Sequence, residues 1–258
     1  MPRKKTFIDN QYHGTKLCDT PRKFSYDYIR AIDGVITTMT ERHSKVLVVR
    51  FDLRYPKDHN ADNSNRDFSG TLQGVCREFS RKGYDPQYVA RREQVTSENQ
   101  HYHVGILLDG NKKRDKSAVI ATVEKYWAKH LDIPLEEVQQ KVLVYPCNKA
   151  PDGSPRENGR MIKRGTLENH KQKQDTMRQL SYLAKVDEND QTPSSTKKFF
   201  TSQFQKDYDT NMQKREYLRE QYRRKTRFSV KTLENMFDRL FVFDGVNTQS
   251  IISPNAAA

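Results

Sequence analysis

Two histidines, His101 and His103, stand one residue apart at the start of the run "HYHVGILLD". In a β-strand, side chains two residues apart share a face, so the two imidazoles are expected to project in parallel. Parallel imidazoles are well placed to bind one divalent cation. Such a pair also arises by chance in a chain with seven histidines, so it is weak evidence when taken alone.

Glu93 precedes His101 by eight residues and falls on the expected partner strand of a β-hairpin. Its carboxylate would complete a site of two imidazoles and one carboxylate. Such a site leaves coordination positions for water or for a phosphate oxygen, as Lewis-acid chemistry requires. The alternative interpretation is an ion pair between Glu93 and Arg91 or Arg92.

A metal that polarises a phosphate still needs a nucleophile, and the segment "RQLSYLAK" offers Tyr182. On a helical wheel with ~100° per residue, Tyr182 shares a basic stripe with Arg178 and Lys185. Leu180 and Ala184 fall near the opposite side. A structural tyrosine would lie among those apolar residues, so the pattern favours a nucleophile.

The phenol must be activated for this role. Free tyrosine has a pKa of ~10, so forming the phenolate nucleophile at pH 7 costs ~4 kcal/mol. An exposed Lys185 one turn along would contribute only roughly a few tenths of a kcal/mol. We therefore expect Lys185 to act mainly as an anchor for the phosphate.

Hydrophobic periodicity predicts the elements that must position these residues. Helices are expected over 24–44, 67–84, 115–132 and 169–190, and strands over 45–56, 87–96, 101–108 and 141–146, with 160–166 as a returning partner of the last strand. The strand at 45–56 alternates, so one face is apolar throughout and the other ends in Arg50 and Asp52. In the strand at 101–108, the apolar side chains face away from the histidines.

The charge of the chain favours a polyanionic partner. Lys and Arg outnumber Asp and Glu by 46 to 33, which gives a net charge of +13. Residues 156–230 hold 18 Lys and Arg against 10 Asp and Glu, which suggests a nucleic-acid track or a solvated basic face. The candidate DNA contacts are Arg50, Arg91, Lys163, Arg164 and Arg178.

The sequence predicts a cytoplasmic protein. No run approaches the ~18–20 apolar residues that cross a bilayer, and the N-terminus lacks an apolar signal segment. The three cysteines show no metal-ligand spacing, which suits a reducing compartment. We expect no contact with a membrane.

Three motifs, taken in their order along the chain, resemble those of the HUH superfamily of single-strand DNA endonucleases. "HYH" is similar to its His-hydrophobic-His motif, "YLAK" to its Tyr-x-x-Lys motif, and "VLVVRFDLRYP" to its upstream strand motif. More narrowly, the chain resembles the inovirus-type replication proteins of filamentous phages and bacterial prophages, the YagK/YfjJ-like group. The resemblance covers about residues 24–190.

The resemblance implies an α+β fold, with a central antiparallel sheet, an RRM-like βαββαβ core and the tyrosine helix laid across the histidine face. His101 and His103, with Glu93 as third ligand, would bind Mg²⁺ or Mn²⁺. Tyr182 would attack a phosphodiester of single-stranded DNA or of an origin hairpin, forming a 5′-phosphotyrosine and freeing a 3′-hydroxyl that primes replication. Lys185 would contact the phosphate or position the tyrosine.

Two departures refine this expectation. No second tyrosine follows Tyr182 on the next turn, so the single-tyrosine mechanism fits. No Walker P-loop is present, so a helicase and a polymerase of the bacterial host are the expected partners. The rival interpretation is a non-catalytic DNA- or RNA-binding regulatory protein of a phage or prophage on the same fold.

The expected organisation has three parts. An N-terminal arm covers residues 1–23, a nuclease domain 24–191, and a basic helical C-terminal extension 192–258. The boundary is placed in "TPSSTKK" at 192–198.

Overall fold

The centre of the protein is an antiparallel β-sheet. The computed structural model describes residues 6–7, 10–18, 23–59, 61–95, 98–150, 152–187 and 189–202. The sheet has the strand order β11-β6-β7-β5-β8, and β9 also pairs with β5. Its strands are β5 (Lys45–Leu53), β6 (Gln87–Glu93), β7 (His101–Asp109), β8 (Val144–Tyr145), β9 (Arg160–Lys163) and β11 (Phe199–Thr201).

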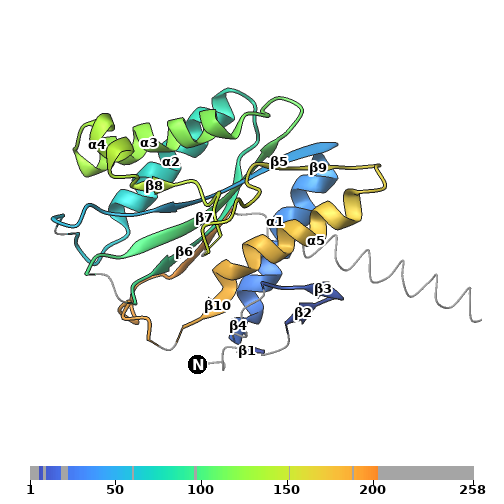
Figure 1. The fold of residues 1–258 in the computed structure, drawn as a ribbon, viewed down its shortest axis with the longest axis horizontal. Helices are drawn as coiled ribbons and strands as arrows, with labels where there is room; N and C mark the ends of the chain where they lie inside the picture. Colours follow the sequence, from blue (N-terminus) through green and yellow to red (C-terminus); the bar gives the residue numbers. More distant parts are fainter. Residues whose placement is uncertain are drawn as a thin grey trace, which may run out of the picture. The chain divides into compact units, whose positions relative to one another are not determined.

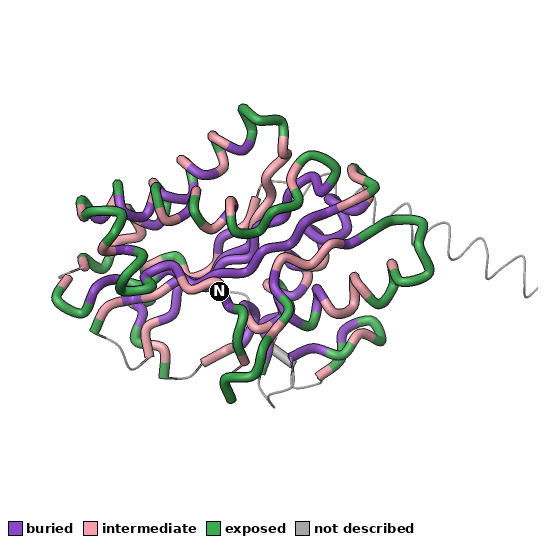
Figure 2. Tube along the Cα trace, turned by 45° about the horizontal axis from the view of Figure 1, so that its top comes forward, coloured by how far each residue is buried: buried purple, intermediate pink, exposed green. Residues whose placement is uncertain are grey.

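Helices cover both faces of this sheet (Figure 1). On one side lie α2 (Arg66–Arg81), α3 (Lys116–Leu131) and the short α4 (Leu135–Gln140); on the other lie α1 (Tyr26–Arg42) and α5 (Asn169–Leu180). The strands are buried along most of their length, whereas the helices also carry exposed residues (Figure 2). The α+β architecture with a central antiparallel sheet is therefore as predicted.

The α2/α3 side of the sheet holds the main hydrophobic core. The predicted alternation is confirmed, because the apolar residues of β5 and β7 lie together in this core with side chains of both helices. The core includes Leu47, Val49, Phe51, Leu53, Tyr102, Val104, Ile106, Leu108, Phe68, Val75, Val123 and Trp127. The same alternation sends the odd-numbered residues of β7 to the opposite face.

That opposite face lies under α1, α5 and the turn that follows α5. α1 packs on β6 and β7, and the turn packs on β6. Gly105 of β7 lies on this face, and a Cβ atom at its position would be 2.5 Å from Leu180 Cδ2. The absence of a side chain at Gly105 thus lets the end of α5 approach the sheet closely.

A second, smaller sheet forms from the two ends of the described chain. It has the strand order β1 (Thr6–Phe7), β4 (Lys23–Ser25) and β10 (Lys185–Val186), and it stands beside a hairpin of β2 (Gln11–Tyr12) and β3 (Thr15–Lys16). Lys185 pairs with Phe24 across this sheet. The sequence predicted a polar arm over 1–23 and helices over 24–44 and 169–190, so the strands of this sheet and of the hairpin were missed.

Several predicted elements need correction. The segment 160–166 does not pair with the strand near 144; β8 and β9 instead pair with successive parts of β5. The helix predicted over 169–190 ends at Leu180 and continues as a 3-10 turn, η1 (Ser181–Ala184). α4 was also missed.

The central sheet takes in one segment that the sequence placed in the C-terminal extension. β11 pairs with β6 through Phe199 and Arg91. The remainder of that extension, 203–258, lies outside the described residues. Within the described part of the chain, no helix is long and apolar enough to cross a membrane.

Gly105→Ala should lower the free energy of unfolding by ~1–3 kcal/mol, because the new methyl group meets the fully buried Leu180. Urea denaturation measures the change. In a Leu180→Ala background the same substitution should cost nothing further, since the obstructing methyl group is gone. An equal cost in both backgrounds would contradict the proposed contact.

Candidate functional site

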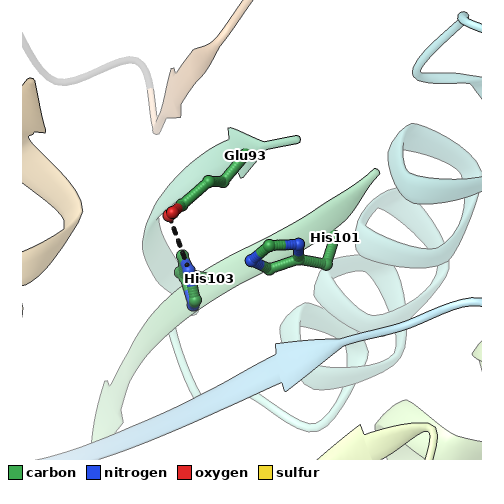
Figure 3. Close-up of side chains that lie close together, drawn as sticks. All are labelled: Glu93, His101 and His103. Carbon is green, nitrogen blue, oxygen red and sulfur yellow. Dashed lines mark hydrogen bonds and ion pairs between the residues drawn. The ribbon is translucent and has the colours of Figure 1, made fainter. Parts of the chain in front are cut away.

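Glu93, His101 and His103 form one cluster on the α1/α5 face of the sheet. Glu93 and His101 are directly opposite in the β6/β7 pair, and His103 follows on the same face. One ligand atom from each residue lies within 4.8 Å of the other two, and the side chains converge (Figure 3). Within the residues that the structure describes, this is the one such cluster of potential metal ligands.

The donor set fits a divalent cation. His103 Nε2 lies 3.0 Å from Glu93 Oε2. Two ligand atoms at adjacent corners of an octahedral site with bonds of ~2.1 Å are ~3.0 Å apart, so these atoms already have the spacing of a shared metal. Imidazole and carboxylate are both common ligands of divalent metal ions in proteins.

Asp52 holds the other ring nitrogen of His103. Its Oδ1 lies 2.6 Å from His103 Nδ1, and both side chains are buried. A carboxylate on the far nitrogen fixes the imidazole orientation and raises its basicity as a ligand. Burial alone would raise the pKa of Asp52, but attraction to His103 and the hydrogen bond with it outweigh burial and hold that pKa at about 2.

The alternation of β5 predicts Asp52 on the charged face of the strand, but it predicts no role for this residue. The missing information was the register, which pairs Asp52 with His103. Alternation in both strands, combined with that register, would have identified the contact.

The ionisation states of His101 and Glu93 suit metal ligands. Burial, followed by repulsion from His103, lowers the pKa of His101 to about 4, so its imidazole is neutral near pH 7 and has a free lone pair. Burial raises the pKa of Glu93, but hydrogen bonds from His103 and Lys185 lower it by more, to well below the usual range. The Glu93 carboxylate is therefore anionic.

Tyr182 lies against this cluster. Its ring stands edge-on to His103, with ring centroids 5.1 Å apart. The turn that carries it is fixed by Ser181, whose hydroxyl accepts a hydrogen bond from Cys18 N at 2.9 Å and donates one to Arg178 O at 2.8 Å. The predicted convergence of the phenol and the imidazoles, some eighty residues apart in sequence, is thus present in the structure.

Lys185 connects the phenol to the carboxylate. Its Nζ donates to Tyr182 Oη at 3.0 Å and lies 2.6 Å from Glu93 Oε1. The predicted helical wheel placed Lys185 one helical turn along, but the residue begins β10 and is only 4% exposed. A buried ammonium that contacts the phenol oxygen directly interacts with it far more strongly than an exposed helical neighbour would.

Glu93 therefore makes ion pairs with His103 and Lys185. The alternative pairing with Arg91 or Arg92 is not found among the ion pairs of the described residues. Arg91 lies 4.0 Å from Asp190 instead.

The predicted DNA contacts lie in three parts of the structure. Arg50 and Arg91 are buried on the histidine face, and the Arg50 guanidinium lies 4.7 Å from the centre of the Tyr182 ring. Arg178 is exposed on the last turn of α5.

Lys163 and Arg164 are exposed and lie away from the cluster. Lys163 pairs with Lys45, seven residues before Asp52 on β5. At the rise of a β-strand this corresponds to ~23 Å. The structure thus does not bring these two residues to the candidate site.

The sequence of the chain matches the model of one known protein family. The family model of the YagK/YfjJ C-terminal domain matches residues 7–202. The chain belongs to the YagK/YfjJ C-terminal domain family. The match to this family spans the whole candidate site, from the N-terminal strands to β11. No curated protein and no solved structure gives a significant match.

Asp52→Asn should weaken Mn²⁺ binding by ~10–100-fold, because it removes the anion that orients His103. Isothermal titration calorimetry with MnCl₂ measures the affinity. Asp85→Asn is the matched control, since Asp85 contacts a different histidine, His43, at 2.8 Å. Equal affinities for the Asp52 variant and the unmodified protein would argue against the cluster as the binding site.

Proposed function

We propose that this protein nicks and rejoins single-stranded DNA, with Tyr182 as the nucleophile, as a replication-initiating endonuclease of the HUH type. The observation that carries the proposal is the position of Lys185 Nζ, which contacts both Glu93 and the Tyr182 hydroxyl. One cation thus joins a candidate metal ligand to a candidate nucleophile. Membership of the YagK/YfjJ family supports the narrower assignment to inovirus-type or prophage replication proteins.

The strand order supports an RRM-like core. In chain order, the elements β5, α2, β6, β7, α3 and β8 form a βαββαβ unit, and their spatial order is β8-β5-β7-β6. The paired histidines lie on β7, one of the two central strands, on the face opposite α2 and α3. This arrangement supports the proposed HUH-type core.

Glu93, His101 and His103 would hold a divalent cation, Mg²⁺ or Mn²⁺. When bound, the ion supplies Lewis acidity that polarises a phosphate oxygen and offsets its negative charge. Asp52 keeps His103 oriented, and burial keeps His101 neutral. These side chains are preorganised by sheet pairing, so little reorganisation is needed when substrate binds.

The chemical step is a transesterification. The Tyr182 oxygen forms a bond to phosphorus, and the bond from phosphorus to the 3′-oxygen breaks. The phenol proton passes to water, and the leaving 3′-oxygen takes a proton from water and becomes the hydroxyl. Lys185 donates to the phenol oxygen and so stabilises the phenolate as the proton leaves.

The wider charge of the protein supports a nucleic-acid substrate. A net charge of +13 favours binding through phosphate neutralisation, which is independent of sequence. Strand separation and DNA synthesis would fall to a helicase and a polymerase of the bacterial host.

Tyr182→Phe should abolish covalent transfer of DNA to the protein, because the attacking oxygen is missing. The assay incubates the protein with Mn²⁺ and single-stranded oligonucleotides of random interior sequence labelled at the 3′ end, because the 3′ fragment is the one that stays attached to Tyr182, and detects labelled protein on a denaturing gel. Tyr145→Phe is the control, since Tyr145 is also on the sheet and pairs with Asp52. Full labelling of the Tyr182 variant would show that the nucleophile is misassigned.

His101→Ala and His103→Ala should each remove nicking while leaving salt-sensitive DNA binding within about a factor of two to three of the parent, since phosphate contacts dominate affinity. Fluorescence anisotropy measures binding and the gel assay measures nicking. If binding and nicking fall together in a folded variant, the histidines support DNA binding alone. A parent protein that binds DNA without nicking it would instead favour the rival function, a non-catalytic nucleic-acid-binding regulator.

A further inference from the structure

We infer that a cleft beside His101 binds the nucleotide on the 5′ side of the nicked bond, the one whose 3′-oxygen leaves. The inference rests on the proposed function and extends it to the placement of the substrate. The cleft lies where β5 ends and where the loop before β7 ends, and both His101 and His103 line it. Its volume of about 530 Å³ falls in the ~300–1,000 Å³ range of small-ligand sites.

Hydrogen bonds fix the backbone that forms the walls of the cleft. Trp127 Nε1 donates to Arg54 O at 2.9 Å, and Arg54 N donates to Leu143 O at 2.8 Å. On the other wall, Asn99 Nδ2 donates to His59 O at 2.6 Å, and Gln100 Nε2 donates to Asp62 O at 2.8 Å. These contacts hold the two loops together, so the cleft is largely preformed.

The lining combines groups that suit a nucleotide. Arg54 and Lys57 are exposed cations at its border and can bind phosphate. Tyr55 and Pro56 provide apolar surface for a base or a sugar, and the exposed Glu98 provides a hydrogen-bond acceptor. Phosphate-binding cations beside an apolar wall are typical of single-strand binding sites.

The position of the cleft relative to Tyr182 sets the polarity. Tyr182 follows Leu180, which packs over Gly105, and its ring contacts His103. The cleft lies toward the His101 end of the row that Gly105, His103 and His101 form on β7, and both histidines line it. In phosphoryl transfer the attacking and leaving oxygens are roughly in line across phosphorus. A phosphate held at the ligand cluster and attacked by Tyr182 therefore directs its leaving 3′-oxygen toward the cleft.

The first test measures the salt dependence of binding. Fluorescein-labelled (dT)₁₂ is titrated with the full-length protein at several salt concentrations, and log K is plotted against log salt. Arg54→Gln/Lys57→Gln should reduce the slope by about 1.4, since each lost contact to single-stranded phosphate removes ~0.7. Both side chains are exposed, so the fold should be unaffected.

The matched control is Lys125→Gln/Lys129→Gln, which removes two exposed cations from α3 on the other side of the sheet. Its slope should equal that of the parent protein. An unchanged slope for the Arg54/Lys57 variant, or an equal reduction in both variants, overturns the cleft as a DNA subsite. This result does not depend on whether the protein nicks DNA.

The second test fixes the polarity. Sequencing of the fragments from the random pool gives a preferred nicking sequence, and one phosphate of that oligonucleotide is then replaced by an uncharged methylphosphonate. Neutralising the phosphate one nucleotide 5′ of the cut should slow the parent protein roughly tenfold, as expected for loss of one charge-assisted hydrogen bond. It should leave the already slower Arg54→Gln/Lys57→Gln variant unchanged.

If this coupling appears instead for the phosphate 3′ of the cut, the cleft holds the other side of the nick and the inference is wrong. Absence of any covalent product from the parent protein overturns the proposed function. The assignment of the cleft to the 5′ side of the cut is then overturned as well. In that case the salt slope still decides whether the cleft binds single-stranded DNA.

Discussion

The buried contact between the Lys185 ammonium and the Glu93 carboxylate is the interaction on which the candidate site depends. Each group alone would be a costly unpaired charge in the interior, and each is stabilised by the other. Glu93 uses one oxygen for Lys185 and the other for His103. Lys185 in turn reaches the Tyr182 hydroxyl. Removing either charge would therefore disturb both the metal-ligand half and the nucleophile half of the site.

The central sheet separates stability from chemistry. Its α2/α3 face is apolar and supplies the main hydrophobic core. Its opposite face buries several ionisable side chains: Arg50, Asp52, Arg91, Glu93 and His103. Placing so many charges against one face is poor for stability, and such departures from an apolar interior are expected at functional sites. The sheet can accommodate these buried polar side chains because the hydrophobic core on its α2/α3 face stabilises the fold.

Local sequence patterns predicted the parts of the site that depend on one element or one hairpin. Alternation gave the histidine face of β7, and the short link between β6 and β7 brought Glu93 opposite His101. The same patterns could not reveal the contact of His103 with Asp52, because it depends on the register of β5 against β7. Nor could they reveal the burial of Lys185, which follows from pairing with a strand at the far end of the sequence. A helical wheel also failed after Leu180, since the tightened turn at Ser181 changes the angle between residues.

The pairing of β4 with β10 has a consequence for the nascent chain. Phe24 pairs with Lys185, and Cys18 N donates a hydrogen bond to the Ser181 hydroxyl. These contacts fix η1, the turn that carries Tyr182, and they close loops of about 160 residues. Contacts of such high sequence separation form only after a large entropic cost has been met, and they can form only once residue 186 has left the ribosome. The reactive groups therefore cannot be brought together until the chain up to β10 has been synthesised. A chain that is still emerging, or one truncated before β10, contains the histidines and the carboxylate but lacks the lysine that holds the phenol beside them.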